Sequence, residues 1–372
     1  MKTNPFLITG YKSPKLFCNR DLDLIRITSA IENQRNITLI SSRRMGKTGL
    51  IMHVFNSNKH LKEYIPVYFD IMGTTGLDEF VEMFSNALIQ KIARTENKLK
   101  RFMKKLGSLR PGLSYDPFTG EPRISLDIRN EQEAVSSLDM IFNIVHQNKQ
   151  SFVIAIDEFQ QIESYPEKNT EAILRTYIQH ASNISFIFSG SKKHMLADMF
   201  SHPSRPLFSS TEMMFLETID KKEYFNFIRE HFTLGGKNIQ DEALISIERH
   251  TNMHTFYVQF LCNRLYGSFK QVTAKEVDQT IHLILKENEP IYANYLNLIT
   301  TTQYKTLRAI ALEGSVTSPT AGHFLANHSL GAASTVSQTV GSLIGKEFLS
   351  DEPGGLLLQD KFFGQWIRMK TG

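Results

Sequence analysis

The chain has 372 residues and a mass of 42.6 kDa, with 41% hydrophobic and 22% charged residues, proportions typical of a folded globular protein with two or three domains. Its net charge of +4 is weak evidence for an acidic partner. Two distant cysteines, Cys18 and Cys262, predict free thiols in a reducing compartment. No apolar run approaches the roughly 20 residues of a membrane span, and the N-terminus lacks a secretory signal. We therefore expect a cytoplasmic protein that does not bind membranes.

A short apolar run at residues 37–40 leads into a turn that ends in Gly46-Lys47-Thr48 and then into helical apolar spacing. This order is typical of a phosphate-binding loop, because backbone N–H groups and the positive end of the helix face the phosphates. Lys47 would reach the outer phosphates, and the Thr48 hydroxyl would bind Mg²⁺. The alternative is a chance Gly-Lys-Thr in an ordinary loop.

The pattern G-x-x-x-x-G-K-[ST] is imperfect here, because Ser41 replaces its first glycine. Gly46 is the glycine that we expect to matter more, since only glycine lets the backbone approach a phosphate without strain. The predicted cofactors are ATP and Mg²⁺. The predicted nucleotide-binding loop consists of Ser41, Ser42, Arg43, Arg44, Met45, Gly46, Lys47, Thr48 and Gly49.

A second candidate site follows the continuous apolar run at residues 151–156, which ends in Asp157 and Glu158. An unbroken apolar strand is typical of a parallel sheet covered by helices on both faces, and such sheets bind ligands at the carboxyl ends of their strands. Asp157 would hold Mg²⁺ through its water shell, and Glu158 would activate the attacking water. Taken alone, the same acidic pair could also cap a helix.

Further strands are predicted at residues 65–70, 184–191 and 212–216, with helices between them at 77–92, 130–146 and 171–181. Alternating strands and helices predict an α/β fold with a doubly wound parallel sheet. A strand between the P-loop strand and the acidic strand, with Glu beside Asp, marks ATPases that carry their own catalytic glutamate. Ser189 would then sense the γ-phosphate or position the water, unless it caps the helix predicted at 194–200.

Four motifs occur in a fixed order: Asn19-Arg20-x-x-Asp23, Ser-Ser-Arg43-Arg44-Met-Gly-Lys-Thr48, Ile-Ala-Ile-Asp157-Glu158-Phe-Gln160 and Phe-Ser-Gly190-Ser191. As a set they resemble the archaeal-type ATPases of the STAND branch of the AAA+ superfamily, over roughly residues 15–270. The resemblance implies an ATP-binding core, a helical lid and a C-terminal winged helix. It also implies that Asn19 and Arg20 lie near the base and ribose. This chain departs from the family pattern in having Asp23 in place of glutamate and an altered lid motif at 252–257. The family's candidate arginine finger follows a Pro-Leu-aromatic motif, whereas here the nearest arginine, Arg205, precedes Pro206-Leu207-Phe208.

The predicted domains are a P-loop core at residues 1–216, a helical lid at 217–290 and a winged helix at 291–372. In the winged helix we expect helices at 302–312, 320–327 and 332–346, with a two-stranded wing after them. Its basic residues are nearly offset by acidic ones, and the predicted recognition helix at 332–346 carries no arginine. Because a basic stripe is missing, contact with protein is at least as well supported as contact with DNA.

An insertion at residues 92–128 combines a basic helical stretch with a β-hairpin around the turn at 115–120. Its charged face is either solvated surface or a docking site for nucleic acid or an acidic protein. The function predicted from the whole sequence is that of a conformational switch that hydrolyses ATP slowly, with an unidentified protein partner and the option of oligomers. The alternative is a DNA-associated regulator that acts through the winged helix and binds ATP with little hydrolysis.

Overall fold

The computed structural model describes residues 4–57, 59–92, 96–105, 107, 111–352 and 354–371. The chain divides into two compact units. Residues Thr9–Ile219 form the first, and residues from Asp220 onwards form the second. The segment Asn4–Ile8, which the sequence places in the core, belongs to the second unit. In the part of the chain that the structure describes, no helix has the length and apolar character needed to cross a membrane.

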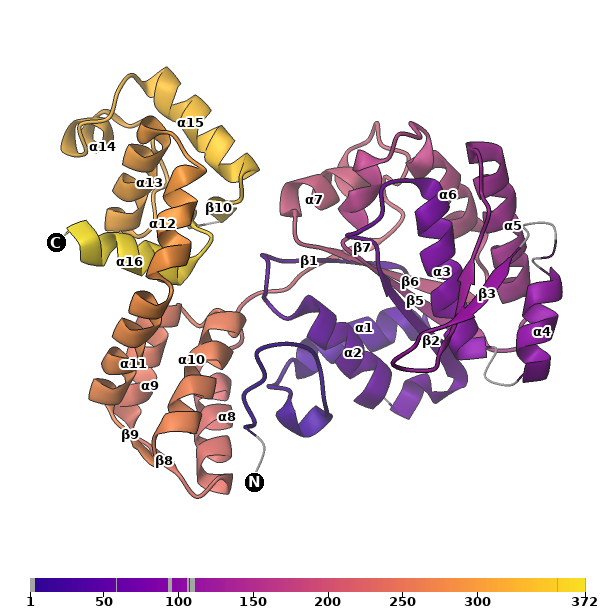
Figure 1. Ribbon diagram of the computed structural model, residues 1–372, viewed down its shortest axis with the longest axis horizontal. Helices are drawn as coiled ribbons and strands as arrows, with labels where there is room; N and C mark the ends of the chain where they lie inside the picture. Colours follow the sequence, from indigo (N-terminus) through magenta and orange to yellow (C-terminus); the bar gives the residue numbers. More distant parts are fainter. Residues whose placement is uncertain are drawn as a thin grey trace. The chain divides into compact units, whose positions relative to one another are not determined.

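The first unit is built on a parallel sheet with the order β2-β5-β6-β1-β7 (Figure 1). Its strands are β1 (Ile37–Ile40), β2 (Tyr64–Asp70), β5 (Ser151–Asp157), β6 (Ile184–Gly190) and β7 (Glu212–Phe215). The predicted α/β fold is confirmed. Strand β6 lies between the P-loop strand β1 and the acidic strand β5, so these two strands are not direct neighbours.

Helices cover both faces of this sheet, which explains why β5 reads as an unbroken apolar run. Alternate residues point to opposite faces: Ile154 belongs to the core under one helical layer, whereas Val153 and Ala155 belong to the other. One layer consists of α1 (Asp21–Glu32) and α2 (Lys47–Ser57). The opposite layer consists of α3 (Leu77–Ile92), α5 (Glu131–His146), α6 (Thr170–His180) and α7 (Lys193–Ser201).

The insertion contains the expected helix and hairpin. Helix α4 (Glu96–Lys105) buries Leu99 and Phe102, and strands β3 (Gly112–Tyr115) and β4 (Pro122–Ser125) pair in antiparallel fashion. The side chain of Asn86 on α3 bonds both the carbonyl and the N–H of Ile124, so the hairpin is fixed to the unit through its backbone. The basic residues Arg94 and Arg110, which we assigned to the charged face, lie outside the described residues.

The second unit begins with the predicted helical bundle. Its helices are α8 (Lys221–Leu234), α9 (Asp241–Thr251), α10 (Thr255–Ser268) and α11 (Ala274–Glu287), and a short parallel pair joins β8 (Asn238–Ile239) to β9 (Gln271–Val272). Thr273 and Glu276 form the capping box that the sequence indicates at the start of α11. Phe6 is buried against the rings of Phe232 and Tyr266, which is why the N-terminal segment belongs to this unit.

The winged helix follows the bundle and includes two helices that we did not predict, α12 and α16. Its elements are α12 (Glu289–Asn297), α13 (Thr301–Glu313), α14 (Gly322–Asn327), α15 (Ala333–Gly345), β10 (Leu349–Glu352), β11 (Gly355–Leu358) and α16 (Lys361–Thr371). In the wing, Gly355 has a φ of +108°, and a Cβ there would lie 2.8 Å from the carbonyl of Val316. Only glycine fits, and this close approach joins the wing to the loop after α13.

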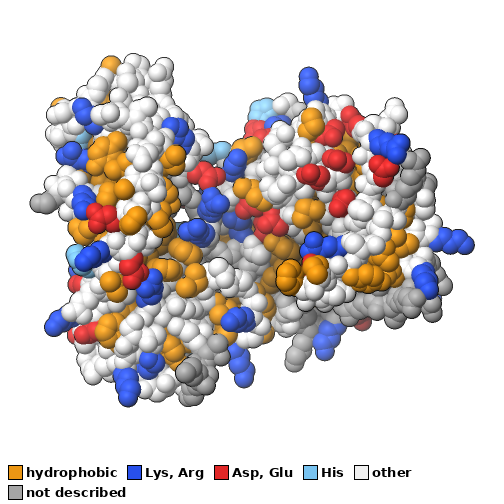
Figure 2. Space-filling view, viewed as in Figure 1, with side chains coloured by type: hydrophobic (Ala, Val, Ile, Leu, Met, Phe, Trp, Pro, Cys, Tyr) orange, Lys and Arg blue, Asp and Glu red, His pale blue; other side chains and the backbone are white. Residues whose placement is uncertain are grey.

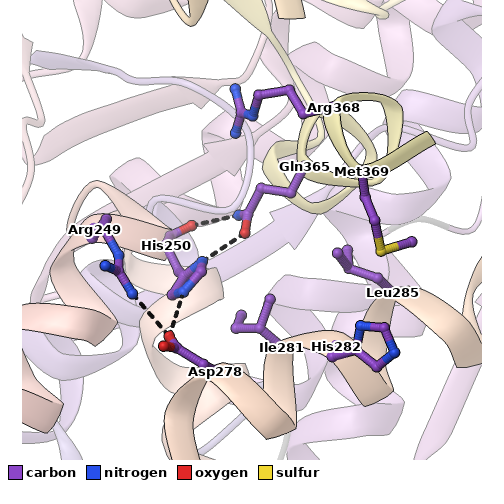
Figure 3. A pocket seen from close by; sticks show the side chains of 9 residues that line it. All are labelled: Arg249, His250, Asp278, Ile281, His282, Leu285, Gln365, Arg368 and Met369. Atoms are coloured by element: carbon purple, nitrogen blue, oxygen red, sulfur yellow. Dashed lines mark hydrogen bonds and ion pairs between the residues drawn. The ribbon is translucent and has the colours of Figure 1, made fainter. Parts of the chain in front are cut away.

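Helix α16 is joined to the bundle at a shallow cavity of about 390 Å³ (Figure 3). The Gln365 amide nitrogen donates to the backbone carbonyl of His250 over 2.8 Å, and its oxygen lies 2.7 Å from His250 Nδ1. The other imidazole nitrogen lies 3.0 Å from Asp278 on α11. Although burial opposes it, hydrogen bonds from His250 and Ser246 hold the pKa of the Asp278 carboxyl below its ordinary value. These contacts link α9, α11 and α16.

Replacing Gln365 with alanine should destabilise this joint, because it removes both hydrogen bonds to His250. We expect the free energy of unfolding of the second unit to fall by about 1–3 kcal/mol in a denaturant titration. Gln338→Ala on α15 is the matched control, since Gln338 is exposed and its loss should change stability by less than about 0.5 kcal/mol. Equal effects of the two substitutions would contradict the assignment.

Candidate active site

The loop between β1 and α2 has the backbone of a phosphate-binding turn. Gly46 adopts a φ of +97°, a conformation that favours glycine, and Arg44 also lies in the left-handed region with a φ of +62°. Ser41 has no positive φ, so its position does not require the glycine that the usual motif carries. The helix begins at Lys47, directly after the turn, so its first backbone N–H groups face the loop.

Lys47 is 6% exposed, and its amine lies among oxygen atoms rather than against hydrocarbon. Lys47 Nζ donates to the Ser41 carbonyl and Ser41 Oγ, both at 3.3 Å, and to the Ser42 carbonyl at 3.4 Å. Burial lowers the pKa of the Lys47 amine, and the negative charges of Glu158 and Asp157 oppose that shift. An anion bound in the loop would compensate this desolvated cation.

Asp157 joins the P-loop to the acidic strand. Its carboxylate is buried, at 3% exposure of the residue, and accepts four hydrogen bonds. Oδ2 accepts from Thr48 Oγ1 over 2.6 Å and from Tyr68 Oη over 3.0 Å. Oδ1 accepts from Ser189 Oγ over 2.5 Å and from the N–H of Glu158 over 3.1 Å. The two motifs thus meet in space, although β6 separates their strands.

Thr48 and Asp157 fit the magnesium site that we predicted. A threonine hydroxyl and a carboxylate are hard oxygen donors of the kind that Mg²⁺ prefers, and here their oxygen atoms are in direct contact beside the phosphate-binding turn. Ser189 does not cap the following helix: its hydroxyl donates to Asp157, and no side-chain cap bond is found at the start of α7. Ser189 therefore lies at the end of β6 in contact with Asp157, and its role as a sensor stays a prediction.

Tyr68 is a site residue that sequence reasoning missed. It lies on β2, whose register places Asp70 beside Asp157, so its hydroxyl reaches the carboxylate from the neighbouring strand. Burial, followed by the negative charge of Asp157, raises the pKa of the Tyr68 hydroxyl far above its ordinary value. The hydroxyl therefore remains a neutral donor. The only signal in the sequence was the Tyr68 hydroxyl, two residues before the end of a mostly apolar strand. Its role in the site can be recognised only once β2 is known to pair with β5.

Glu158 lies directly after β5 in the left-handed region, with a φ of +55°. Its Oε2 accepts from the Gln160 amide over 2.6 Å, from Ser191 Oγ over 2.8 Å and from the Ser191 N–H over 3.2 Å. The side chain is half-buried and close enough to Lys47 to shift the pKa of the amine. Glu158 is thus a fixed carboxylate at the same sheet edge as the P-loop.

Phe17, just before the Asn19-Arg20-x-x-Asp23 motif, packs on α2. Phe17 stacks on His53 at a ring distance of 4.2 Å, and a Cβ on Gly49 would lie 3.5 Å from its ring. Asn19 Oδ1 accepts the N–H of Asp21, and Arg20 Nη1 bonds Asp23 at 3.3 Å. This places Asn19 and Arg20 at the start of α1, and their contact with base and ribose stays a prediction. Of the remaining loop residues, Met45 is buried, whereas Arg43 and Arg44 are exposed.

Arg205 has a structural environment that does not favour the arginine-finger interpretation. Its guanidinium bonds Glu163 and Glu171 and lies 3.3 Å from Asp198. These carboxylates come from the 3₁₀ helix after β5, from α6 and from α7 within the same unit. The guanidinium therefore ties three elements of the core together.

Residues 17–252 match the model of a family described as an ATPase domain predominantly from Archaea. This protein belongs to that family. The predicted archaeal-type P-loop ATPase relationship is thereby confirmed. Residues 290–369 match a second model, described as a probable winged helix domain, which agrees with the predicted C-terminal fold. Among curated proteins, none matches the chain in sequence.

Solved structures with the same fold include the Walker-type ATPase Paby2304 of Pyrococcus abyssi. The two chains are 15% identical, with a TM-score of 0.64 over 98% of this chain and 99% of that one. Another is the Aeropyrum pernix ORC1 protein, solved in complex with DNA, at 10% identity and a TM-score of 0.51 over 96% of this chain and 94% of that one. At these identities the likeness concerns the fold alone.

Gly46→Ala should abolish ATP binding by this ATPase domain, because a Cβ is unfavourable at a φ of +97° and the turn must distort to accept it. Gly236→Ala in the second unit is the matched control, since Gly236 has a φ of +71° with open space around it. Both substitutions should cost about 1–2 kcal/mol of stability, and only the first should remove binding of a fluorescent ATP analogue. Retained binding by Gly46→Ala would contradict the assigned loop.

Proposed function

We propose that this protein is an Mg²⁺-dependent ATPase of the AAA+/STAND type, which hydrolyses ATP to ADP and phosphate and uses the reaction as a slow conformational switch. The observation that carries the proposal is the 2.6 Å hydrogen bond between Thr48 Oγ1 and Asp157 Oδ2. It brings a phosphate-loop hydroxyl and a strand-end carboxylate to one point, where one magnesium–triphosphate group can engage both.

ATP binding would rest on the turn and on Lys47. The N–H groups at the start of α2 would bond the phosphates, and the amine of Lys47 would exchange its weak bonds to Ser41 and Ser42 for the outer phosphates. Those bonds are long, at 3.3 and 3.4 Å, so the exchange costs little. Bound Mg²⁺, held by Thr48 and Asp157, would neutralise phosphate charge and orient the triphosphate.

Glu158 is the residue suited to activate the attacking water. The water oxygen bonds to the γ-phosphorus while the bond from that phosphorus to the β–γ bridging oxygen breaks, and the bridging oxygen leaves with ADP. Glu158 takes the proton that the water loses. Its carboxylate is held by Gln160 and Ser191 and not by the donors that bond Asp157, which supports a role separate from that of the metal ligands.

The same contacts support a switch. Ser189 bonds Asp157 and Ser191 bonds Glu158, so the end of β6 is tied to both carboxylates. Loss of the γ-phosphate would alter these bonds and reach α7, which begins two residues after Ser191. The altered lid motif at residues 252–257 favours slow turnover. An unidentified protein partner, in the cytoplasm, or a second copy of the chain would receive the signal.

Glu158→Gln should bind ATP with unchanged affinity but hydrolyse it about 10²–10⁴-fold more slowly, because the amide cannot accept the proton. Phosphate release in the presence of Mg²⁺ and the equilibrium affinity for ATP are the two measurements. Glu230→Gln, an exposed position on α8, is the control that should retain full turnover. Full Mg²⁺-dependent turnover by Glu158→Gln would contradict the role of Glu158 as proton acceptor.

A protein partner fits the winged helix better than DNA does. Helix α15 exposes neutral side chains, among them Ser334, Ser337 and Gln338, and carries no lysine or arginine. The nearest basic side chain, Lys346, donates to the Leu298 carbonyl and to Gln303 and so serves the internal packing. On the face shown in Figure 2, basic and acidic side chains of the described residues are interspersed without a basic stripe. Helix α15 thus lacks the basic residues that are typical of a DNA-reading helix.

A duplex titration followed by fluorescence anisotropy tests the alternative of a DNA-associated regulator. Contacts with DNA phosphates are strongest at low salt, and even under that condition we expect α15 to contribute no affinity for the duplex. Replacing Gln338 with alanine should therefore leave any residual binding of the duplex by the chain unchanged. Tight binding by the wild type, or turnover stimulated by DNA, would favour the DNA-associated alternative.

A further inference from the structure

Glu158 is held by two side chains, Gln160 and Ser191, to which the hydrolysis step above assigns no role. Three donors converge on one carboxylate oxygen, Oε2: the Gln160 amide, the Ser191 hydroxyl and the Ser191 N–H. Among the described residues, no hydrogen bond reaches the other oxygen, Oε1. A carboxylate that is fixed at one oxygen has the other available to accept a proton.

We propose that Gln160 and Ser191 are positioning residues for Glu158, which clamp Oε2 so that Oε1 takes the proton of the attacking water. The inference rests on the proposed ATPase function. It adds two residues that act through Glu158 and do not touch the substrate.

The backbone gives the first argument. Glu158 is not a glycine, yet it adopts a φ of +55°, which is unfavourable for a residue with a Cβ. Such a conformation persists when the surroundings determine it, and here the Gln160 and Ser191 contacts hold the side chain of the same residue. Without them, the carboxylate of this half-buried glutamate would sample several rotamers, and only a fraction of these would reach the water.

The environment of Gln160 gives the second argument. Its side chain is 3% exposed, and a Cβ on Gly190 would overlap its Oε1. The absence of a side chain at Gly190 therefore makes room for this amide. Gln160 Oε1 has no hydrogen-bond partner among the described residues, although it is buried. The opposite orientation of the amide would aim that oxygen at the Glu158 carboxylate, so the orientation seen is the one that favours the clamp.

The neighbouring residue supplies a contrast. Gln161 has the same side chain, but its amide donates to the Thr74 carbonyl and to Ser164, away from Glu158. Gln160 and Gln161 are therefore adjacent residues of the same type in one 3₁₀ helix (Phe159–Ser164), but their amides donate to different groups. This makes Gln161→Met a matched control for Gln160→Met, which keeps the shape of the side chain and loses its donor.

The test measures kcat and the affinity for ATP in the full-length protein carrying Gln160→Met, Ser191→Ala or Gln161→Met. The clamp predicts that the first two lower kcat about tenfold or more without changing ATP affinity, since each removes a bond to a charged group that is formed away from the nucleotide. Gln161→Met should leave both quantities unchanged. Ser191→Thr, which restores a hydroxyl, should recover most of the kcat lost in Ser191→Ala.

A double-mutant comparison separates positioning from general damage. In the Glu158→Gln background, Gln160→Met should cause no further loss of turnover, because the group that it positions is already disabled. A further loss of the same size would overturn the proposal, as would unchanged or increased kcat in the single variants; increased kcat would mean that the bonds restrain Glu158. Retained turnover in Glu158→Gln alone would instead refute the proposed ATPase mechanism, so the two failures are distinguishable.

Discussion

The buried carboxylate of Asp157 is the feature on which the site depends. A buried charge is costly unless it is fully hydrogen-bonded, and here four donors satisfy it. They come from the P-loop helix, from strands β2 and β6, and from the next backbone N–H. Because each donor comes from a different part of the fold, the carboxylate fixes the ends of three strands relative to the phosphate-binding turn. Loss of any donor would be felt by the others through the same group.

Strand β6 divides its polar side chains between the two neighbouring carboxylates. Ser189 bonds Asp157, and Ser191, just beyond the strand end, bonds Glu158. The left-handed backbone at Glu158 turns the second carboxylate away from the first, so that adjacent residues serve different roles. The two carboxylates are thereby held side by side without sharing their hydrogen-bond donors, as the proposed roles of metal ligand and proton acceptor require. Strand β6 thus completes the sheet between β1 and β5 and also, through Ser189 and Ser191 at its end, bonds both carboxylates.

Elements with a strong local pattern were predicted well, and elements defined by their neighbours were not. The capping box at Thr273 and the apolar run into Asp157 are visible in sequence because they depend on nearby residues. Helix α16 was missed: its apolar side chains acquire their meaning from packing on α13 and Tyr292, and Gly364 weakens its local signal. The contact of Tyr68 and the ion pairs of Arg205 were likewise not predicted, since their partners lie on other elements.

Sequence alone determined the fold class, the family and the motifs of the candidate site, because a P-loop and a strand-end acidic pair are short motifs with local physical requirements. Tertiary structure decided which groups meet. The order of parallel strands is set by crossover connections and packing rather than by any local pattern. For that reason the Tyr68 contact to Asp157 and the clamp of Gln160 and Ser191 on Glu158 became visible only in the folded chain.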